Sequence, residues 1–130
     1  MIPRYRAWIK IEECFADYIE SIRFYSKEID LCWGGICESD CFDFDDIELM
    51  QSTGLKDKNG KEIFEKDILD YNGRKVIVKW HGSYAGFIYE FVDELKNRTT
   101  EWQPLYLSYY KFEIIGNSLE NPELLEVEDE

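Results

Sequence analysis

The sequence has a single histidine, His81, so any mechanism that needs an imidazole must use this residue. His81 follows Trp80 at the end of an expected strand and precedes a glycine-rich turn, which favours a solvated turn residue. The chain also lacks a glycine-rich phosphate loop and a nucleophile elbow. We therefore predict no enzymatic activity, no catalytic residue and no cofactor.

Long apolar runs are missing as well. No stretch approaches the length needed to cross a membrane, and the segment from Met1 to Arg6 has no apolar signal core. We therefore expect a cytoplasmic protein without a membrane partner. In that reducing compartment the thiols stay free, and the sequon at Asn97 is a chance match.

Four cysteines are present, Cys14, Cys32, Cys37 and Cys41. The last three are separated by four and three residues and lie among acidic residues, so a zinc site in the Cys32–Cys41 segment is one interpretation. Structural zinc sites favour more closely spaced cysteine pairs and four ligands. We expect no bound metal and free thiols that pack as small apolar side chains.

Basic residues are few: 15 Lys and Arg stand against 28 Asp and Glu, giving a formal net charge of -13. Twelve acidic and two basic residues fall between positions 12 and 53, a local charge of -10. Such acidity repels phosphate backbones, so we expect no nucleic-acid partner. The acidic run and the carboxylate after it are candidate partner-binding residues: Asp43, Asp45, Asp46 and Glu48.

The 130 residues suit one domain with one core, which the 16% of aromatic residues would dominate. Residues 5–11 alternate, with Tyr5, Ala7, Ile9 and Ile11 on one face, and predict a half-buried strand. Residues 14–33 favour two strands joined by a turn at 26–28, although a helix over 12–23 is an alternative.

The segment 49–69, LMQSTGLKDKNGKEIFEKDIL, contains two turn signals. Gly54 and Gly60 stand where the backbone needs positive φ, and Asp57 can bond local amides in a tight turn. Asp67 is placed to cap a short helical turn over residues 64–66.

Residues 68–71 and 75–80 predict a hairpin, because Asn72-Gly73 between them is a strong hairpin signal. A turn at 82–86 and a strand at 87–92 follow, then a charged excursion over 93–100. Further strands are expected at 105–110 and 112–115. Asn121 then provides an N-cap with Pro122 in the first helical position.

Three segments together resemble the YopX family of phage and prophage proteins: residues 49–69, Arg4-Tyr5-Arg6-Ala7-Trp8, and residues 115–125. The resemblance implies a mainly β fold, an SH3-like roll or partly open small β-barrel, over residues 54–115. An additional N-terminal strand and a hairpin flank it within one domain, 1–130, that ends in an acidic tail, 126–130. The matched motif residues, interpreted as structural, are Gly54, Asp57, Gly60, Asp67, Gly116, Asn121 and Pro122.

This chain departs from the family pattern at Lys66, where a glycine is common, which predicts a relaxed turn. The cysteine-rich acidic segment 32–46 has no family counterpart. Since the family has no settled activity, the expected function is that of a phage or prophage accessory protein, a non-enzymatic protein-binding module in the bacterial cytoplasm. Exposed sheet edges also favour a homo-oligomer.

Two alternatives stay open. One is an acidic nucleic-acid mimic that occupies a host DNA-binding protein. The other is a weak nucleic-acid binder that uses basic side chains and rings around the hairpin: Lys56, Lys58, Lys61, Arg74, Lys75, Lys79, Tyr71, Trp80 and Tyr89.

Overall fold

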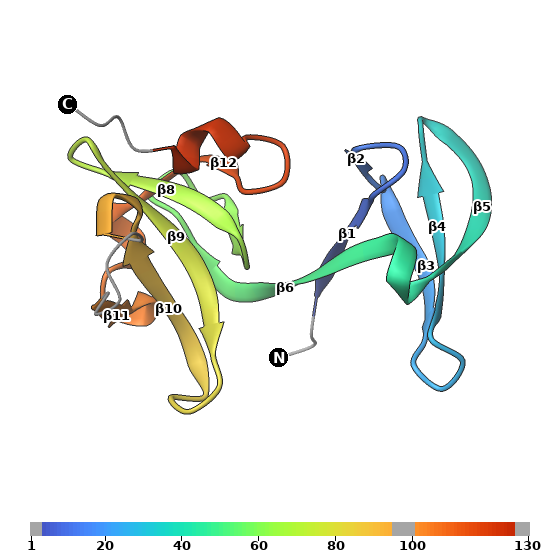
Figure 1. Cartoon of the computed structure of the whole chain (residues 1–130), viewed down its shortest axis with the longest axis horizontal. Helices are drawn as coiled ribbons and strands as arrows, with labels where there is room; N and C mark the ends of the chain where they lie inside the picture. The colour runs from blue at the N-terminus through green and yellow to red at the C-terminus, as the bar shows by residue number, and fades with distance from the viewer. Residues whose placement is uncertain (1–3, 95–100, 127–130) are drawn as a thin grey trace. The chain divides into compact units, whose positions relative to one another are not determined.

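The computed structural model describes residues 4–94 and 101–126, except for the side chains of Ile36, Cys37 and Glu94. The described residues are mainly β-strand and include a curled, barrel-like sheet, so the predicted fold class is confirmed (Figure 1). The chain divides into two compact units, Ile2–Gln51 and Ser52–Glu130, called here the N-terminal and C-terminal units. The sequon at Asn97 and most of the predicted excursion and acidic tail lie outside the described residues.

The N-terminal unit is built from antiparallel strands. Its elements are β1 (Tyr5–Ile9), β2 (Cys14–Phe15), β3 (Tyr18–Arg23), β4 (Glu28–Trp33), β5 (Ile36–Asp43), the 3-10 turn η1 (Phe44–Asp46) and the first half of β6 (Ile47–Lys56). In one sheet β1 lies between β2 and β6, and in the other β4 lies between β3 and β5. The predicted N-terminal strand and hairpin are confirmed, and β5 adds a third strand to the hairpin.

The first predicted strand needs one correction. It ends at Ile9, and residues 10–13 form a turn that leaves Ile11 82% exposed rather than buried. Trp8, which alternation placed on the outer face, is buried and packs edge-on against Phe15 at 5.0 Å between ring centroids. The helix alternative for 12–23 is wrong, because β2 and β3 occupy that stretch.

The C-terminal unit contains the second half of β6 and the remaining elements. These are β7 (Glu62–Phe64), β8 (Asp67–Tyr71), β9 (Arg74–His81), β10 (Gly86–Phe91), η2 (Val92–Glu94), β11 (Trp102–Pro104), η3 (Leu105–Leu107), η4 (Tyr109–Lys111), β12 (Glu113–Asn117) and η5 (Pro122–Leu125). Five strands form an antiparallel sheet in the order β11-β10-β9-β8-β12.

The hairpin β8–β9 is confirmed with the expected turn. Asn72 and Gly73 have φ values of 51° and 86°, which are the left-handed values that a two-residue type I′ turn requires. The strand predicted at 105–110 is wrong, because η3 and η4 bend that stretch. The bends let Leu105 and Phe112 both reach the interior, where they are 0% and 2% exposed.

Buried apolar side chains form two clusters instead of the expected single core. The cluster of the N-terminal unit is centred on Ala7, Ile9, Ile29, Leu31 and Ile47. That of the C-terminal unit is centred on Ile63, Leu69, Val76, Val78, Leu105 and Phe112. The assignment of residues 1–130 to one domain stays a prediction.

β6 contributes to both units. Residues 47–51 pair with β1, and residues 52–56 pair with β7 (Figure 1). The register shifts between Ser52 and Lys56, and Gly54 within this shift has a φ of 76°. The predicted positive φ at Gly54 is confirmed. The predicted turn is wrong, because the glycine allows an irregularity inside a continuing strand.

Candidate functional site

Asp57 organises the first motif turn, as predicted. Its carboxylate is 5% exposed, and Oδ1 accepts hydrogen bonds from the amides of Asn59 and Lys61, both at 2.9 Å. Oδ2 accepts from the amide of Ile114 in β12 at 3.0 Å. Gly60 in the same turn has the predicted positive φ, 82°. Asp57 therefore closes a local turn and connects it to a distant strand.

Asp67 holds the next turn, between β7 and β8. Its buried carboxylate accepts a hydrogen bond from the amide of Phe64 at 2.8 Å. The bond was expected, but residues 65–66 form a two-residue turn rather than a helical one, and this turn links β7 to β8 in a different sheet. Lys66 has a φ of 69°, so the geometry that suits glycine is kept and the predicted relaxation is wrong.

The last motif segment packs closely. A Cβ on Gly116 would lie 2.5 Å from Oδ1 of Asn121, the oxygen that accepts the amide of Asn117 at 3.2 Å. Pro122 begins η5 with Asn121 at the N-cap position, as predicted. The side chain of Asn121 makes no cap hydrogen bond and turns back to Asn117 instead. Each of these hydrogen bonds joins parts of the chain to one another, which agrees with the structural interpretation of the motif.

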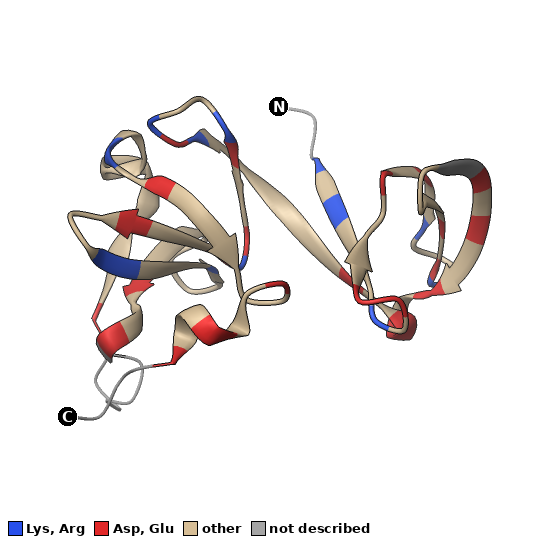
Figure 2. Ribbon diagram, turned by 90° about the horizontal axis from the view of Figure 1, so that it is seen from above, with Lys and Arg blue, Asp and Glu red and all other residues tan. Residues whose placement is uncertain are grey.

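The acidic candidates lie along the end of β5 and into β6 (Figure 2). Asp43, Asp45 and Asp46 are exposed, and their carboxylates make no hydrogen bond or ion pair within the described part of the chain. Glu48 in β6 is half-buried. Lys10 fixes the backbone of this run: its Nζ donates to the carbonyl of Asp45 at 2.8 Å. The backbone of the run is thus anchored at Asp45, and the three aspartates are exposed.

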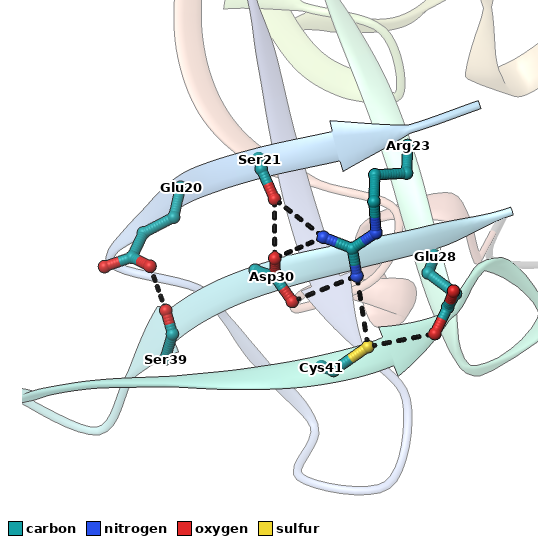
Figure 3. A network of polar contacts seen from close by, with 7 residues as sticks. All are labelled: Glu20, Ser21, Arg23, Glu28, Asp30, Ser39 and Cys41. Carbon is teal, nitrogen blue, oxygen red and sulfur yellow. Dashed lines mark hydrogen bonds and ion pairs between the residues drawn. The ribbon is translucent and has the colours of Figure 1, made fainter. Parts of the chain in front are cut away.

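A polar network covers the adjoining face of the sheet β3-β4-β5 (Figure 3). The guanidinium of Arg23 donates to both carboxylate oxygens of Asp30, and Ser21 donates to Asp30 Oδ2 at 2.6 Å. Arg23 Nη2 also contacts Cys41 Sγ at 3.4 Å, and that thiol donates to Glu28 at 3.3 Å. At the far end Ser39 donates to Glu20 (Figure 3).

The network favours ionised carboxylates. Hydrogen bonds from Arg23 and then Ser21 lower the pKa of Asp30 from 3.8 to about 2. The hydrogen bond from Cys41 lowers the pKa of Glu28, and the same bond raises the pKa of the Cys41 thiol. Since Arg23 is committed to Asp30, Glu28 and Glu20 add further negative charge to this face.

The described cysteines differ in burial. Cys32 is buried, Cys14 is half-buried, and Cys41 is exposed, so the expected packing as a small apolar side chain is wrong for Cys41. All three are free thiols, and the side chain of Cys37 lies outside the described residues. Among the described residues, no three His, Cys, Asp or Glu side chains are grouped closely enough to hold a metal ion.

Carboxylates pair with half of the basic candidates of the C-terminal unit. Lys58 lies 3.8 Å from Glu113, Arg74 lies 3.0 Å from Asp93, and Lys79 lies 3.5 Å from Glu90. Two of the three candidate rings, Tyr71 and Tyr89, pack edge-on against Phe112. Trp80 is 50% exposed. Three of the six basic candidates are thus paired with carboxylates, and two of the three candidate rings pack against the buried cluster of the C-terminal unit.

His81 is more constrained than a solvated turn residue, which corrects that expectation. Its Nδ1 accepts the amide of Tyr84 at 3.0 Å, and its ring lies 4.7 Å from that of Trp102. Beside it, a groove of about 400 Å³ is lined by Thr53, Leu55, Tyr84, Ala85, Gly86, Phe87 and Tyr106. The imidazole is thus part of an aromatic cluster.

A model of the family described as YopX protein matches residues 4–126. The chain belongs to the YopX family. Its structure is similar to the crystal structure of protein EF1440 from Enterococcus faecalis, with a TM-score of 0.62 and 30% identity over 97% of this chain and 99% of that one. No functionally curated protein matches it. The YopX match covers both units, including the acidic run.

Sequence reasoning identified the acidic run of this YopX protein but missed the network around Arg23 and Asp30. Polar residues two positions apart on three successive strands, at 21 and 23, 28 and 30, and 39 and 41, were the available signal. Their convergence depends on the register shift between Ile19 and Ser21, which no local pattern predicts.

Proposed function

We propose that this protein is a non-enzymatic accessory protein of phage or prophage type that binds a basic partner protein in the bacterial cytoplasm. The observation that carries the proposal is the set of exposed carboxylates of Asp43, Asp45 and Asp46, which lie at and just beyond the end of β5 of the sheet β3-β4-β5 and outnumber the neighbouring cation Lys10. Clustered charges of one sign steer a partner of opposite sign and favour one orientation of it.

The test is capture from nuclease-treated bacterial cytosol with two matched variants. The first, D43N/D45N/D46N, neutralises three exposed carboxylates of the acidic run. The control, E101Q/E123Q/E126Q, removes the same charge from exposed positions of the C-terminal unit. A partner retained by the wild type and the control but lost with the first variant supports the proposal. Equal loss with both variants, or a partner indifferent to both, contradicts it.

A second candidate function is nucleic-acid mimicry, in which the same acidic residues occupy the DNA-binding surface of a host protein. The exposed acidic run supports this function too, so the two differ in the partner and not in the surface. For mimicry, duplex DNA would compete with the captured partner, and the complex would dissociate as salt rises. A partner that binds equally well with excess DNA contradicts mimicry.

Direct nucleic-acid binding through the hairpin lysines receives less support, because carboxylates pair with Lys58, Arg74 and Lys79. A mobility shift of single-stranded DNA at low salt, abolished by a Lys75 and Lys79 charge reversal, would reinstate it. Self-association also stays an expectation, and sedimentation at several concentrations tests it.

A further inference from the structure

We propose that the free edge of β5 accepts an added strand: an extended segment of a partner protein with Lys or Arg at alternate positions. The inference rests on the proposed function and specifies how the partner is held. Strand addition uses main-chain hydrogen bonds for affinity and alternate side chains for selectivity.

β5 is an edge strand. The sheet order is β3-β4-β5, and within the described strands β5 pairs with β4 alone. It is eight residues long, from Ile36 to Asp43, which is longer than edge strands that proteins protect by shortening. Its residues Glu38, Ser39, Asp40 and Cys41 are exposed. The strand therefore offers a long template for pairing.

The alternation of hydrogen-bonded and non-bonded residue pairs between β4 and β5 shows which backbone groups of β5 point outward. The amide of Phe44 donates to the carbonyl of Lys27 at 2.9 Å. Bonded and non-bonded pairs alternate along an antiparallel ladder, so the even-numbered residues of β5 bond to β4. The amide and carbonyl groups that point to the free edge therefore belong to Ser39, Cys41 and Asp43.

A second hydrogen bond leads to the same assignment of outward-pointing groups. Cys32 on β4 is the register partner of Ser39, and its carbonyl accepts the amide of Asp17 on the β3 side at 2.7 Å. Cys32 is thus directed away from β5, and its partner Ser39 is left with its main-chain groups outward. Two independent contacts therefore agree on which groups an added strand would meet.

Charge selects the occupant. The edge carries Glu38, Asp40 and Asp43, and the exposed Asp45 and Asp46 follow it. A second copy of β5 would place carboxylates beside carboxylates, which is unfavourable for directly opposed pairs. Side chains alternate between the two faces of a strand, so Lys or Arg on alternate residues of an added strand would lie on one face only. They would sit either beside Asp43 on the network face or beside Glu38 and Asp40, which accepts a hydrogen bond from Trp33, on the other face. The acidic edge therefore excludes its own copy and favours a basic strand.

The experiment uses the full chain and a short capped peptide of alternating lysine and valine, followed by fluorescence anisotropy. Binding that weakens as salt rises is expected for this peptide, and none for the matched glutamate–valine peptide. N-methylation of the lysine–valine backbone on its bonding edge should weaken binding about tenfold, because main-chain donors are lost while the charge is kept.

A pair of protein variants gives the reciprocal control. Cys41→Pro removes an amide that points away from β4, so the internal ladder stays intact and peptide affinity should fall about tenfold. Cys41→Ala also removes the thiol but keeps the amide, so the tenfold loss in Cys41→Pro is measured relative to Cys41→Ala. If Cys41→Pro does not fold, the N-methylated peptide makes the same test.

Hydrogen exchange read by NMR separates strand addition from simple charge attraction. Saturating peptide should slow exchange of the Ser39, Cys41 and Asp43 amides by about tenfold or more. Binding without this protection overturns strand addition while leaving the acidic partner surface in place. Failure of the basic peptide to bind, or protection of the same amides in the peptide-free protein at high concentration, also overturns it.

Discussion

Lys66 shows how a single backbone position can be tested for strain. Its φ of 69° lies in the left-handed region, where a Cβ costs roughly 1–2 kcal/mol. We predict that Lys66→Gly is more stable than Lys66→Ala by about 1 kcal/mol in urea unfolding. Both variants lack the lysine side chain, so the comparison isolates the effect of the Cβ atom. An alanine variant as stable as the glycine variant would contradict the strain.

Asp57 is the second residue whose effect follows directly from its contacts. Its carboxylate accepts three amides from two parts of the chain, and replacement by alanine leaves those donors unpaired. We predict that Asp57→Ala lowers the free energy of unfolding by about 3 kcal/mol. The free energy of unfolding of Asp57→Asn should lie between those of Asp57→Ala and the wild type in the same denaturation measurement, since one acceptor oxygen remains.

The lowered pKa of Asp30 makes the stability of the folded state depend on pH. Its pKa is about 2 in the folded chain and near 4 when the carboxyl is free, so the folded state is favoured by its ionisation above about pH 4. That contribution should disappear as the pH falls from 4 to 2. We predict that wild type unfolds at a higher temperature than Asp30→Asn at pH 6, and that the difference shrinks below pH 4. A constant difference would contradict this assignment.

At the scale of elements, η5 packs on β12 through one glycine. A methyl group at Gly116 would overlap the side chain of Asn121, so we predict that Gly116→Ala destabilises the chain by about 1–3 kcal/mol. The double variant with Asn121→Ala should recover part of this loss, because the obstructing amide is gone. Strictly additive single effects in a double-mutant cycle would show that the two residues are uncoupled.

The elements predicted well were those with a local cause. Asn72-Gly73 determined the β8–β9 turn, and Gly60 and Asp57 determined theirs, because the φ values and the hydrogen bonds arise within a few residues. The stretch 105–110 has strand-prone residues but bends, since Leu105 and Phe112 must both be buried in one cluster. Tertiary packing overrode local preference there.

In the candidate site, too, the features with a local cause were predicted and those that depend on strand pairing were not. Exposure of Asp43, Asp45 and Asp46 follows from their own polarity, and the sequence was sufficient to single them out. The contact of Arg23 with Asp30 and Cys41 needs three strands in a defined register, including one irregularity. The outward phase of β5 likewise depends on which pairs are hydrogen-bonded, and composition carries no information on that point.

At the scale of the whole molecule, the two units are expected to unfold together. The N-terminal unit has about 50 residues, a size at which an isolated core is marginal, and β6 belongs to both units. We predict one transition in urea, seen identically by Trp8 and Trp33 in one unit and by Trp80 and Trp102 in the other. Variants that keep only one tryptophan pair allow the measurement, and separated midpoints would contradict the single-domain prediction.

The sharing of β6 also limits how this chain can change in length. Side chains alternate between the two faces of a strand, so one residue inserted between the buried Ile47 and Met50 would reverse the face of one of them relative to β1. The exposed turn at 82–85, in contrast, lies outside the paired strands, so lengthening it costs loop entropy and the local bond between the Tyr84 amide and His81. Insertions are therefore better tolerated at that turn than within residues 47–51, whose length is fixed by their pairing with β1.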